Sequence, residues 1–400
     1  MTAVLEKKEG LLAQWASGRP VAGMSLLLGE APRHVRLKRV HFSRTRPVQL
    51  EFVATLRSGL DVPVIAEHCH REAEAHAARV SASLMKSRNG QRAGLSAAAV
   101  VADREAGLVL RRPGLDERLP GLKLLHDRGA ARAVLADLTG RDPGPVAVRL
   151  VAHRLGKRAV LRIALPGGPV FARLRTVKSG EGADRLARHR ALWEALGREG
   201  HLRIPKPLGA APDLGLALFG ALPGQAPAFG PEDCRAIDRA LETLRGLDPA
   251  GLPAHTEGDE ARLLLGWFER CRDYMPALAD AIGPKLHRLF AEMSVRPAVL
   301  RPCHRDLHEK QILIAQGIAG LLDFDTLSLA DPALDPGNLL AHLFLAGREE
   351  RSLNAAIGGP GVRLWRRAAL FRLAMIRAFS SAPMAELRRL VDEASADDRD

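Results

Sequence analysis

Two acidic segments, about a hairpin apart, contain the residues of this chain best suited to chemistry. The first, residues 304–311, reads HRDLHEKQ, and the second, residues 322–325, reads LDFD. The apolar residues between them indicate two short strands. Phosphoryl transfer from a nucleotide requires a carboxylate that orients and deprotonates a hydroxyl, and an amide oxygen and a second carboxylate that hold magnesium. Asp306, Gln311 and Asp323 supply these groups, so we predict a kinase-type phosphotransferase site.

The length and composition of the chain bound its class. Its 400 residues are too many for one compact core, and 46% hydrophobic and 26% charged residues are ordinary for a soluble globular protein. No stretch approaches the roughly 20 apolar residues of a membrane helix, and the first residues lack the apolar core of a signal peptide. Cys69, Cys234, Cys271 and Cys303 match no zinc or redox spacing. We therefore expect two or three domains, no membrane partner and a cytoplasmic location.

The net charge of +13 and the pI near 10.3 raise the alternative of a nucleic-acid-binding protein. Basic residues are spread along the whole chain with acids between them, and aromatic residues, which stack on bases, make up only 4%. The sequence also has no basic tail. We therefore do not expect nucleic acid as a partner, and we interpret the charge as favouring an anionic ligand such as a nucleotide.

The N-terminal half carries the same predicted order of elements twice. After an N-terminal helix and connector (1–34), residues 35–123 show three strands, a helix and two strands, and residues 140–225 repeat that order. Short matches, such as PVIA and PVFA in the third strands, recur at offsets between 106 and 110 residues. We predict a duplicated small α+β module. The alternative, that such short matches arise by chance in a biased composition, stays open.

The C-terminal half, residues 226–400, is predicted to be mainly helical around the two acidic segments. Pro231 followed by two acids marks the start of one helix, and amphipathic stretches indicate several more. The expected helices are 231–247, 259–271, 275–293, 337–345 and 362–387. A β-rich part, a helical part and an acidic loop between short strands make the α+β architecture of a two-lobed kinase.

A family resemblance rests on three blocks that occur in order. HRDLHEKQ at 304–311, LDFD at 322–325 and ADPALDPGNLL at 330–340 resemble the catalytic region of the aminoglycoside phosphotransferase and choline kinase superfamily. The resemblance implies a two-lobed protein-kinase-like fold of the α+β class. In this chain the fold would have a duplicated N-lobe-like module and a mainly helical C-lobe with the catalytic loop. The resemblance covers roughly residues 140–345, so the module at 35–123 lies outside the usual family plan.

The resemblance also implies roles for individual residues, with ATP and Mg²⁺ as cofactors. Asp306 would be the catalytic base, and His304 would fix the loop through backbone hydrogen bonds. Asp323 would bridge Mg²⁺ to the phosphates, and Asp335 would brace the catalytic loop. Gln311 stands where the family usually has a metal-binding Asn. Its amide oxygen offers the same ligand chemistry one methylene further from the backbone.

The small lobe departs from the family pattern at the phosphate-binding position. Where kinases place a Lys on the third strand, this chain has Arg173, which keeps the charge but is bulkier and forked. Lys178, at the end of the same strand, is an alternative. The stretch from Leu218 to Leu222 resembles the hinge whose backbone pairs with adenine, so these two leucines are the candidate nucleotide contacts.

The first module departs further. Glu67 occupies the position that aligns with Arg173, and a carboxylate there would repel phosphates. We therefore expect a structural or regulatory role for residues 35–123. The first hairpin of the second module, residues 153–158, contains a single glycine, so no glycine-rich phosphate loop is visible.

We predict an ATP-dependent phosphotransferase that phosphorylates a hydroxyl of a small molecule. A sugar, an amino alcohol or another metabolite fits equally well, whereas a cationic aminoglycoside does not suit a chain this basic. The competing hypothesis is a pseudokinase, a binding or scaffolding protein that keeps the fold without transfer; Arg173 and Gln311 motivate it. The acceptor, the choice between ATP and GTP and the oligomeric state are left open by the sequence.

Overall fold

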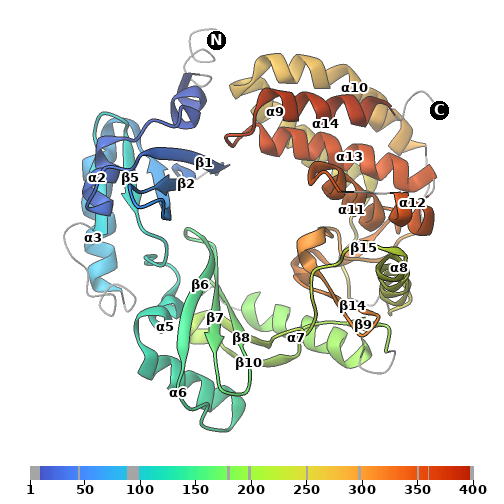
Figure 1. The fold of residues 1–400 in the computed structure, drawn as a ribbon, viewed down its shortest axis with the longest axis horizontal. Helices are drawn as coiled ribbons and strands as arrows, with labels where there is room; N and C mark the ends of the chain where they lie inside the picture. The colour runs from blue at the N-terminus through green and yellow to red at the C-terminus, as the bar shows by residue number, and fades with distance from the viewer. Residues whose placement is uncertain are drawn as a thin grey trace. The chain divides into compact units, whose positions relative to one another are not determined.

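The computed structural model describes residues 10–43, 46–87, 99–177, 181–196, 200–248, 251–295, 299–348, 351–358 and 360–396. The chain divides into two compact units (Figure 1). One, the β-rich unit, consists of Gln14–Arg190 and Lys206–Ala221. The other, the helical unit, consists of Met1–Ala13, Ala191–Pro205 and Leu222–Asp400. Among the described helices, none has the length and apolar character needed to span a membrane.

The β-rich unit contains two five-stranded sheets. The first has the strand order β1-β2-β3-β5-β4, and α3 follows its third strand; the second has the order β6-β7-β8-β11-β10, and α7 follows its third strand. All neighbouring strands in both sheets are antiparallel. The bounds are β1 His34–His41, β2 Val48–Thr55, β3 Asp61–His68, α3 Ala73–Lys86, β4 Val100–Asp103, β5 Leu108–Arg111, β6 Ala147–Arg154, β7 Arg158–Ala164, β8 Val170–Arg175, α7 Glu181–Leu196, β10 Pro207–Ala211 and β11 Leu216–Gly220.

The two sheets therefore share one topology, with the elements at the places that the sequence suggested. The sequence did not indicate α5 (Lys123–His126) and α6 (Arg128–Thr139), which connect the sheets. The α6 helix starts at Asp127, whose carboxylate accepts a hydrogen bond from Ala130 N, as expected for an N-cap. Apolar residues of α6 pack with one face of the second sheet in a shared core, while α7 lies on the other side of that sheet (Figure 1).

The helical unit surrounds two small sheets. Its helices are α8 Pro231–Arg245, α9 Glu257–Tyr274, α10 Pro276–Ser294, α11 Leu334–Leu345, α12 Arg351–Ile357, α13 Pro360–Arg377 and α14 Met384–Ala396. The α8 helix has Pro231 in its first turn with two acids beside it, which suits the positive end of a helix. Thr256 and Asp259 form a capping box at the start of α9. The helices predicted at 231–247, 259–271, 275–293 and 337–345 are therefore present with shifted boundaries. The single helix predicted at 362–387 is wrong, because the chain leaves the helical conformation between Arg377 and Met384 and forms α13 and α14 instead.

The small sheets carry the acidic segments. One pairs β12 (Arg301–Cys303) with β15 (Ser328–Ala330), and the other has the order β13-β14-β9, formed by Ile312–Ala315, Ile318–Leu321 and Leu202–Arg203. The β13 and β14 strands form an antiparallel hairpin in which Ile312 lies opposite Leu321. Apolar side chains from this hairpin, α8 and α11 share one buried cluster. The hairpin is therefore fixed to the core, and its two ends hold the residues that the sequence singled out.

Candidate active site

The loop after β12 is held by one buried carboxylate. Asp335, in the first turn of α11, accepts hydrogen bonds from His304 N at 2.7 Å and from Arg305 N at 2.6 Å. Arg305 has a φ of 69°, a left-handed conformation that costs energy for a residue with a Cβ. Burial raises the pKa of Asp335, and the charge of His304 and the two backbone N–H groups oppose that shift. The predicted bracing contact between Asp335 and the loop is thus present.

A second set of contacts fixes the end of the same loop. Asn338 on α11 donates from Nδ2 to the backbone oxygen of Leu307 at 2.8 Å, and its Oδ1 accepts from Arg372 on α13. Arg372 also donates to Glu260 on α9 at 2.6 Å, and the other oxygen of Glu260 lies 2.9 Å from His255 Nε2. Burial would raise the pKa of Glu260, but Arg372 and His255 hold it below its usual range. Three helices far apart in the sequence, α9, α11 and α13, thus support this loop.

Most of this network has no signal in the sequence. Asn338 belongs to the third block of the family resemblance, but its partner was not foreseeable. Glu260 and Arg372 lie on amphipathic helices in which charged residues are common, so neither stands out. Their burial, with Glu260 only 1% exposed, is what identifies them as structural.

The backbone of Leu322 joins the two acidic segments. Its backbone nitrogen donates to the backbone oxygen of Gln311 at 2.9 Å, and its backbone oxygen lies 2.7 Å from His304 Nε2. The oxygen of His304 in turn accepts from Thr326 Oγ1 at 2.8 Å. The His304 ring is fully buried and packs edge-on against Phe324, with 4.9 Å between the centroids. The loop after β12 and the segment after β14 therefore meet at the open end of the β13–β14 hairpin.

Asp306 lies exposed between these fixed points. Within the described residues its carboxylate has no hydrogen bond or ion pair, although its charge acts on His308. Burial lowers the pKa of His308, and the charges of Asp306 and Glu309 oppose that effect. A carboxylate with free acceptor positions on a rigid loop suits a group that must receive a proton from another molecule.

Gln311 and Asp323 lie at the open end of the β13–β14 hairpin, one just before β13 and the other shortly after β14. Gln311 is 7% exposed, and its Oε1 is buried with no hydrogen-bond partner among the described residues. Asp323 directly follows Leu322 and has a φ of 66°, so the chain turns sharply there. A buried carbonyl oxygen without a donor normally costs stability, but it is a suitable ligand for a hard cation.

The described residues contain no group of three or more His, Cys, Asp or Glu side chains able to hold a metal ion. Mg²⁺ sites of nucleotide enzymes do not require such a group, because one or two carboxylates act there together with phosphate oxygens and water. One amide oxygen and one carboxylate, as at Gln311 and Asp323, therefore fit a Mg²⁺ ion that arrives with a nucleotide. They do not form a complete metal site by themselves.

In the β-rich unit, Arg173 lies on the α7 face of the second sheet. Along β8, Val170, Ala172 and Leu174 point into the core shared with α6, so Phe171 and Arg173 point the other way. Phe171 pairs with Phe219 of β11, and His189 of α7 packs against Phe219 with 4.8 Å between the ring centroids. Lys178 lies outside the described residues.

The two hinge leucines differ in their surroundings. Leu218 is fully buried in the core on the α6 side, so its side chain faces away from Arg173 and only its backbone is placed to pair with a ligand. Leu222 belongs to the helical unit, where it packs on β14. A Cβ added to Gly320 would meet Leu222 Cδ2 at 2.5 Å. A glycine at 320 is thus required by this close approach.

The acid of the first module is neutralised within that module. Glu67 is 7% exposed, and its carboxylate forms an ion pair with Arg111, which is 1% exposed. The same carboxylate lies 3.3 Å from His76 Nε2. Arg111 also contacts Glu117 at 3.2 Å. A buried acid engaged in this way contributes to the core of the first module, and it occupies the charge of Arg111 on the same sheet.

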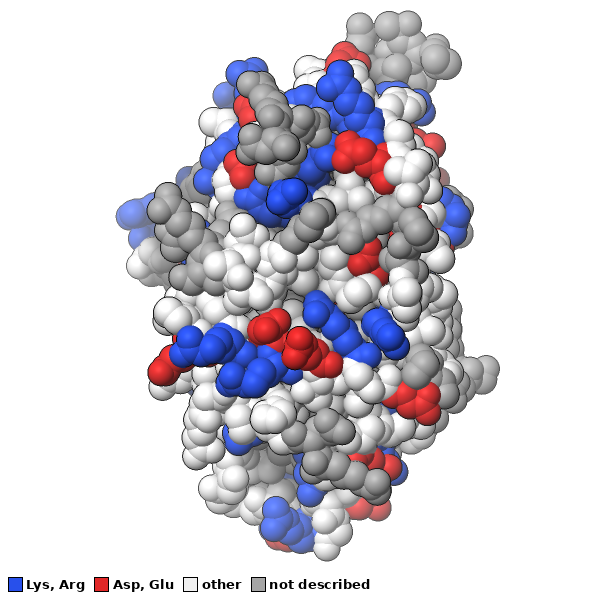
Figure 2. Space-filling view, turned by 90° about the vertical axis from the view of Figure 1, so that its right-hand side faces the viewer, with Lys and Arg blue, Asp and Glu red and all other residues white. Residues whose placement is uncertain are grey.

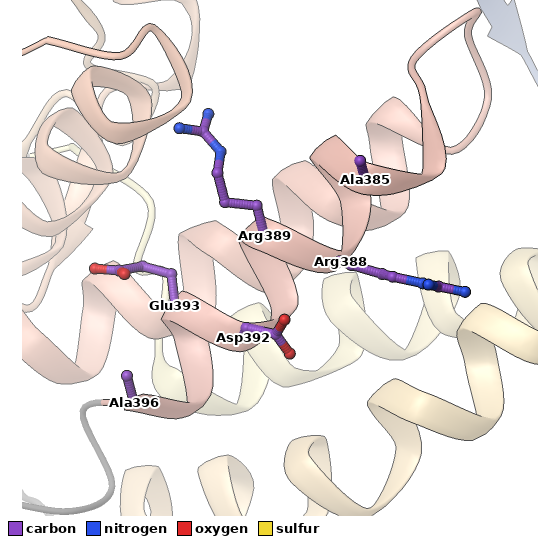
Figure 3. A pocket seen from close by; sticks show the side chains of 6 residues that line it. All are labelled: Ala385, Arg388, Arg389, Asp392, Glu393 and Ala396. Carbon is purple, nitrogen blue, oxygen red and sulfur yellow. The ribbon is translucent and has the colours of Figure 1, made fainter.

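Two surface features lie apart from these motifs. A pocket of about 600 Å³ along α14 is lined by Ala385, Arg388, Arg389, Asp392, Glu393 and Ala396, none of which belongs to the acidic segments (Figure 3). On the face shown in Figure 2, Lys and Arg side chains occur in separate groups with Asp and Glu among them.

Comparison with known proteins identifies the family. The model of the phosphotransferase enzyme family matches residues 92–371, more than half of the chain. A thermostable mutant of aminoglycoside phosphotransferase APH(4)-Ia, solved in a ternary complex with AMP-PNP and hygromycin B, has a similar fold. It is 12% identical with a TM-score of 0.50, over 67% of this chain and 97% of that one.

Two further solved structures are similar at lower TM-scores. A putative fructosamine-3-kinase from Thermobifida fusca YX-ER1 is 20% identical with a TM-score of 0.48, over 68% of this chain and 99% of that one. Choline kinase from Cryptosporidium parvum Iowa II is 11% identical with a TM-score of 0.49, over 66% of this chain and 96% of the choline kinase chain. None of the curated proteins matches the chain.

The chain belongs to the phosphotransferase enzyme family. Its fold is α+β and protein-kinase-like, so the family resemblance read from residues 304–340 is confirmed. The aligned regions span about two thirds of this chain and nearly the whole length of the solved relatives.

Proposed function

We propose that this protein is an ATP-dependent phosphotransferase that phosphorylates a hydroxyl of a small molecule. The hydroxyl oxygen attacks the γ-phosphorus of ATP, its proton passes to the carboxylate of Asp306, and the bond from the γ-phosphorus to the β–γ bridging oxygen breaks to release ADP. His304 and Asp335 position the loop and do not take part in proton transfer. The observation that carries the proposal is the exposed Asp306 on a loop whose backbone is fixed on both sides.

Gln311 and Asp323 are the proposed protein ligands of Mg²⁺. The ion would neutralise charge on the β- and γ-phosphates when bound with ATP. Support comes from the buried, unpartnered Oε1 of Gln311 and from the hydrogen bonds at Leu322 that fix both ends of the hairpin. In the β-rich unit, Arg173 is the proposed contact for the α- and β-phosphates, and the backbone of Leu218–Leu222 is the proposed adenine hinge. The position of Arg173 on the sheet face opposite the α6 core supports its role.

The organisation of the chain is proposed in the same terms. Residues 1–34 form an N-terminal helix and connector, and 35–123 and 140–225 form two N-lobe-like modules that arose by duplication. Residues 226–400 form the helical C-lobe with the catalytic loop. The common strand order of the two sheets and the position of the helix after the third strand support duplication. A cytoplasmic location also remains part of the proposal.

The acceptor is proposed to be an uncharged or weakly charged hydroxyl compound. A relative of this fold binds hygromycin B, but a cationic aminoglycoside requires acidic surroundings, and this chain has a net charge of +13. A sugar or an amino alcohol carries the required hydroxyl without a large positive charge.

A second candidate is a nucleotide-binding pseudokinase. Arg173 at the usual Lys position and Gln311 at the usual Asn position favour it, because both change the geometry around the phosphates. The contacts between Asp335 and the loop favour the enzyme, since they hold Asp306 in place at the cost of a strained Arg305.

The experiment is a screen with γ-labelled ATP, Mg²⁺ and a panel of hydroxyl-bearing metabolites. We expect labelled product with the wild type and a loss of at least about 10²-fold for Asp306→Asn, the scale of general-base catalysis. Asp392→Asn, an exposed acid of α14, is the matched control and should keep full activity. Mg²⁺-dependent nucleotide binding without any transfer would support the pseudokinase, and absence of nucleotide binding would refute both.

A further inference from the structure

Basic side chains gather where the two modules of the β-rich unit meet. The tip of the β6–β7 hairpin, at Gly156, lies against the first module and the segment after β5 (Figure 1). Arg46, just before β2, donates from Nη1 to the backbone oxygen of Gly156 at 2.9 Å. A Cβ on Gly156 would meet Arg46 Nη1 at 2.7 Å and Arg118 Cδ at 3.4 Å, so both arginines lie over the tip. The cationic residues around it are Arg39, Arg46, Arg118, Arg154, Lys157 and Arg158.

The hairpin tip is held rigidly in this position. Asp116 accepts a hydrogen bond from Gly156 N at 2.5 Å and lies 3.1 Å from His153 Nε2. The side chains of Asp116 and His153 are each 1% exposed. Burial would raise the pKa of Asp116, but the contacts with His153, Gly156 and Arg118 hold it below its usual range. The cations are therefore arranged in a fixed geometry before any ligand arrives.

The cations at the tip repel one another. Partial burial lowers the pKa of Lys157, and the charges of Arg154, Arg46 and Arg158 lower it further. For Arg154, burial lowers the pKa first, then the charges of Arg158 and Arg39. Bringing like charges together opposes folding unless an anion offsets them. The arrangement therefore suggests that a negatively charged group binds here.

Among the described residues, the nearby carboxylates neutralise these cations only in part. Glu51, which lies opposite Arg39 and whose charge reaches Arg154, is also engaged with His41 Nε2 at 2.6 Å and with Lys38 Nζ at 3.7 Å. Asp116 is committed beneath the hairpin to Gly156 and His153. In the part of the chain that the structure describes, Arg46, Arg154 and Lys157 are thus not matched by an equal number of carboxylates.

Arg154 is the side chain best prepared for a ligand. It is half-buried, and its Nε has no hydrogen-bond partner in the part of the chain that the structure describes. The planar guanidinium donates in a fork that matches the oxygens of a phosphate group. Lys157, exposed at the tip, and Arg46 and Arg39 from the first module provide further positive charge around it.

We propose that the junction of the two modules is a phosphate-binding site, with Arg154 and Lys157 from the hairpin and Arg39 and Arg46 from the first module as its cationic residues. The phosphate belongs either to a separate phosphorylated small molecule or to the nucleotide. Only the second source rests on the proposed function. In both cases the first module contributes to binding through Arg39 and Arg46, a role that Glu67 does not provide.

The same hairpin supplies a matched control. Arg149 and Arg162 lie opposite each other on β6 and β7 and are both exposed, whereas Arg154 and Arg158 are the opposite pair next to the tip. Neutralising Arg149 and Arg162 removes two charges from the same hairpin away from Gly156. A general attraction between a basic protein and an anion would respond equally to either pair of changes.

The test is calorimetric titration of the full chain with tripolyphosphate in EDTA, so that no metal contributes. We expect binding by the wild type, at least about tenfold weaker binding by Arg154→Gln/Lys157→Gln, and less than about twofold change in Arg149→Gln/Arg162→Gln. Arg46→Gln, which leaves the hairpin sequence intact, should also weaken binding several-fold. Melting curves check that each variant is folded. Equal affinity in the two double variants, or no binding by the wild type, would overturn the proposal.

Two further arms separate the sources of the phosphate. Displacement of tripolyphosphate by metal-free ATP but not by glucose 6-phosphate assigns the site to the nucleotide, and the reverse assigns it to a separate phosphorylated compound. The titration is repeated with Asp306→Asn, which should bind tripolyphosphate like the wild type. Failure of phosphoryl transfer with intact anion binding would refute the proposed function alone, and intact transfer with no anion binding would refute this inference alone.

Discussion

Replacing Gln311 by Met is expected to stabilise the metal-free protein and to remove its stabilisation by Mg²⁺ and nucleotide. The Oε1 of Gln311 is buried without a partner among the described residues, and such an atom costs about 1–3 kcal/mol. Met is similar in length and has no oxygen to desolvate, so the variant should gain about 1 kcal/mol in the free energy of unfolding. Urea titration with and without Mg²⁺ and AMP-PNP measures both effects.

The matched control is Gln49→Met, in β2. Gln49 is also 7% exposed, but neither atom of its amide is buried without a partner. This change should be neutral or destabilising. In the wild type, ligand at about 100 times its Kd should add about 2.7 kcal/mol, whereas the Gln311→Met protein should gain far less. The reasoning is refuted if Gln311→Met lowers stability in the absence of metal, or if ligand stabilises this variant as much as the wild type.

Three other changes test the support of the site. Gly337→Ala should lower the free energy of unfolding by about 1–3 kcal/mol in urea titrations, because a Cβ there would meet backbone atoms of α13 at 2.7–2.8 Å. The control Gly266→Ala on α9, which has only a flexible side chain 3.8 Å away, should be neutral or stabilising. Glu260→Gln should lower the free energy of unfolding by about 3–5 kcal/mol at neutral pH. Because the pKa of Glu260 is lowered from 4.5 in the folded protein, this loss should shrink as the pH falls below 4.5. A loss that stays constant with pH would contradict the ion pair. Asp335→Asn should cost about 1–3 kcal/mol and most of the transfer activity, because one of two buried N–H groups loses its acceptor, whereas Asp331→Asn, whose carboxylate accepts one hydrogen bond from a backbone N–H two residues later, should leave activity within about threefold.

Much of the fold could be predicted because local signals were strong. Alternating apolar residues marked the strands of both modules, and Pro231 with its two acids marked the start of α8. The α6 helix was missed because its alanine-rich sequence has few large apolar residues and Gly129 lies in its first turn. Its stability comes from packing on the second sheet, which a local pattern does not reveal.

The site was predictable to the extent that its residues are close in sequence. Asp306, Gln311 and Asp323 lie within one hairpin's length, so their spacing alone indicated the chemistry. The supports of the loop are different. Arg372 contacts Glu260, 112 residues away in the sequence, and Asn338, 34 residues away. Only the folded chain brings these residues together beneath Leu307. Likewise, the contact of Asp116 with Gly156 depends on how the two modules pack.

The most direct test of the account is calorimetric binding of AMP-PNP with and without Mg²⁺ to the wild type, Asp323→Asn and Asp306→Asn. The account assigns the two carboxylates different tasks, one holding the ion and the other receiving a proton. It therefore predicts that Mg²⁺ strengthens nucleotide binding in the wild type and in Asp306→Asn, and that this effect is lost in Asp323→Asn. An equal effect of Mg²⁺ on all three proteins, or its loss in Asp306→Asn alone, would contradict the assignment.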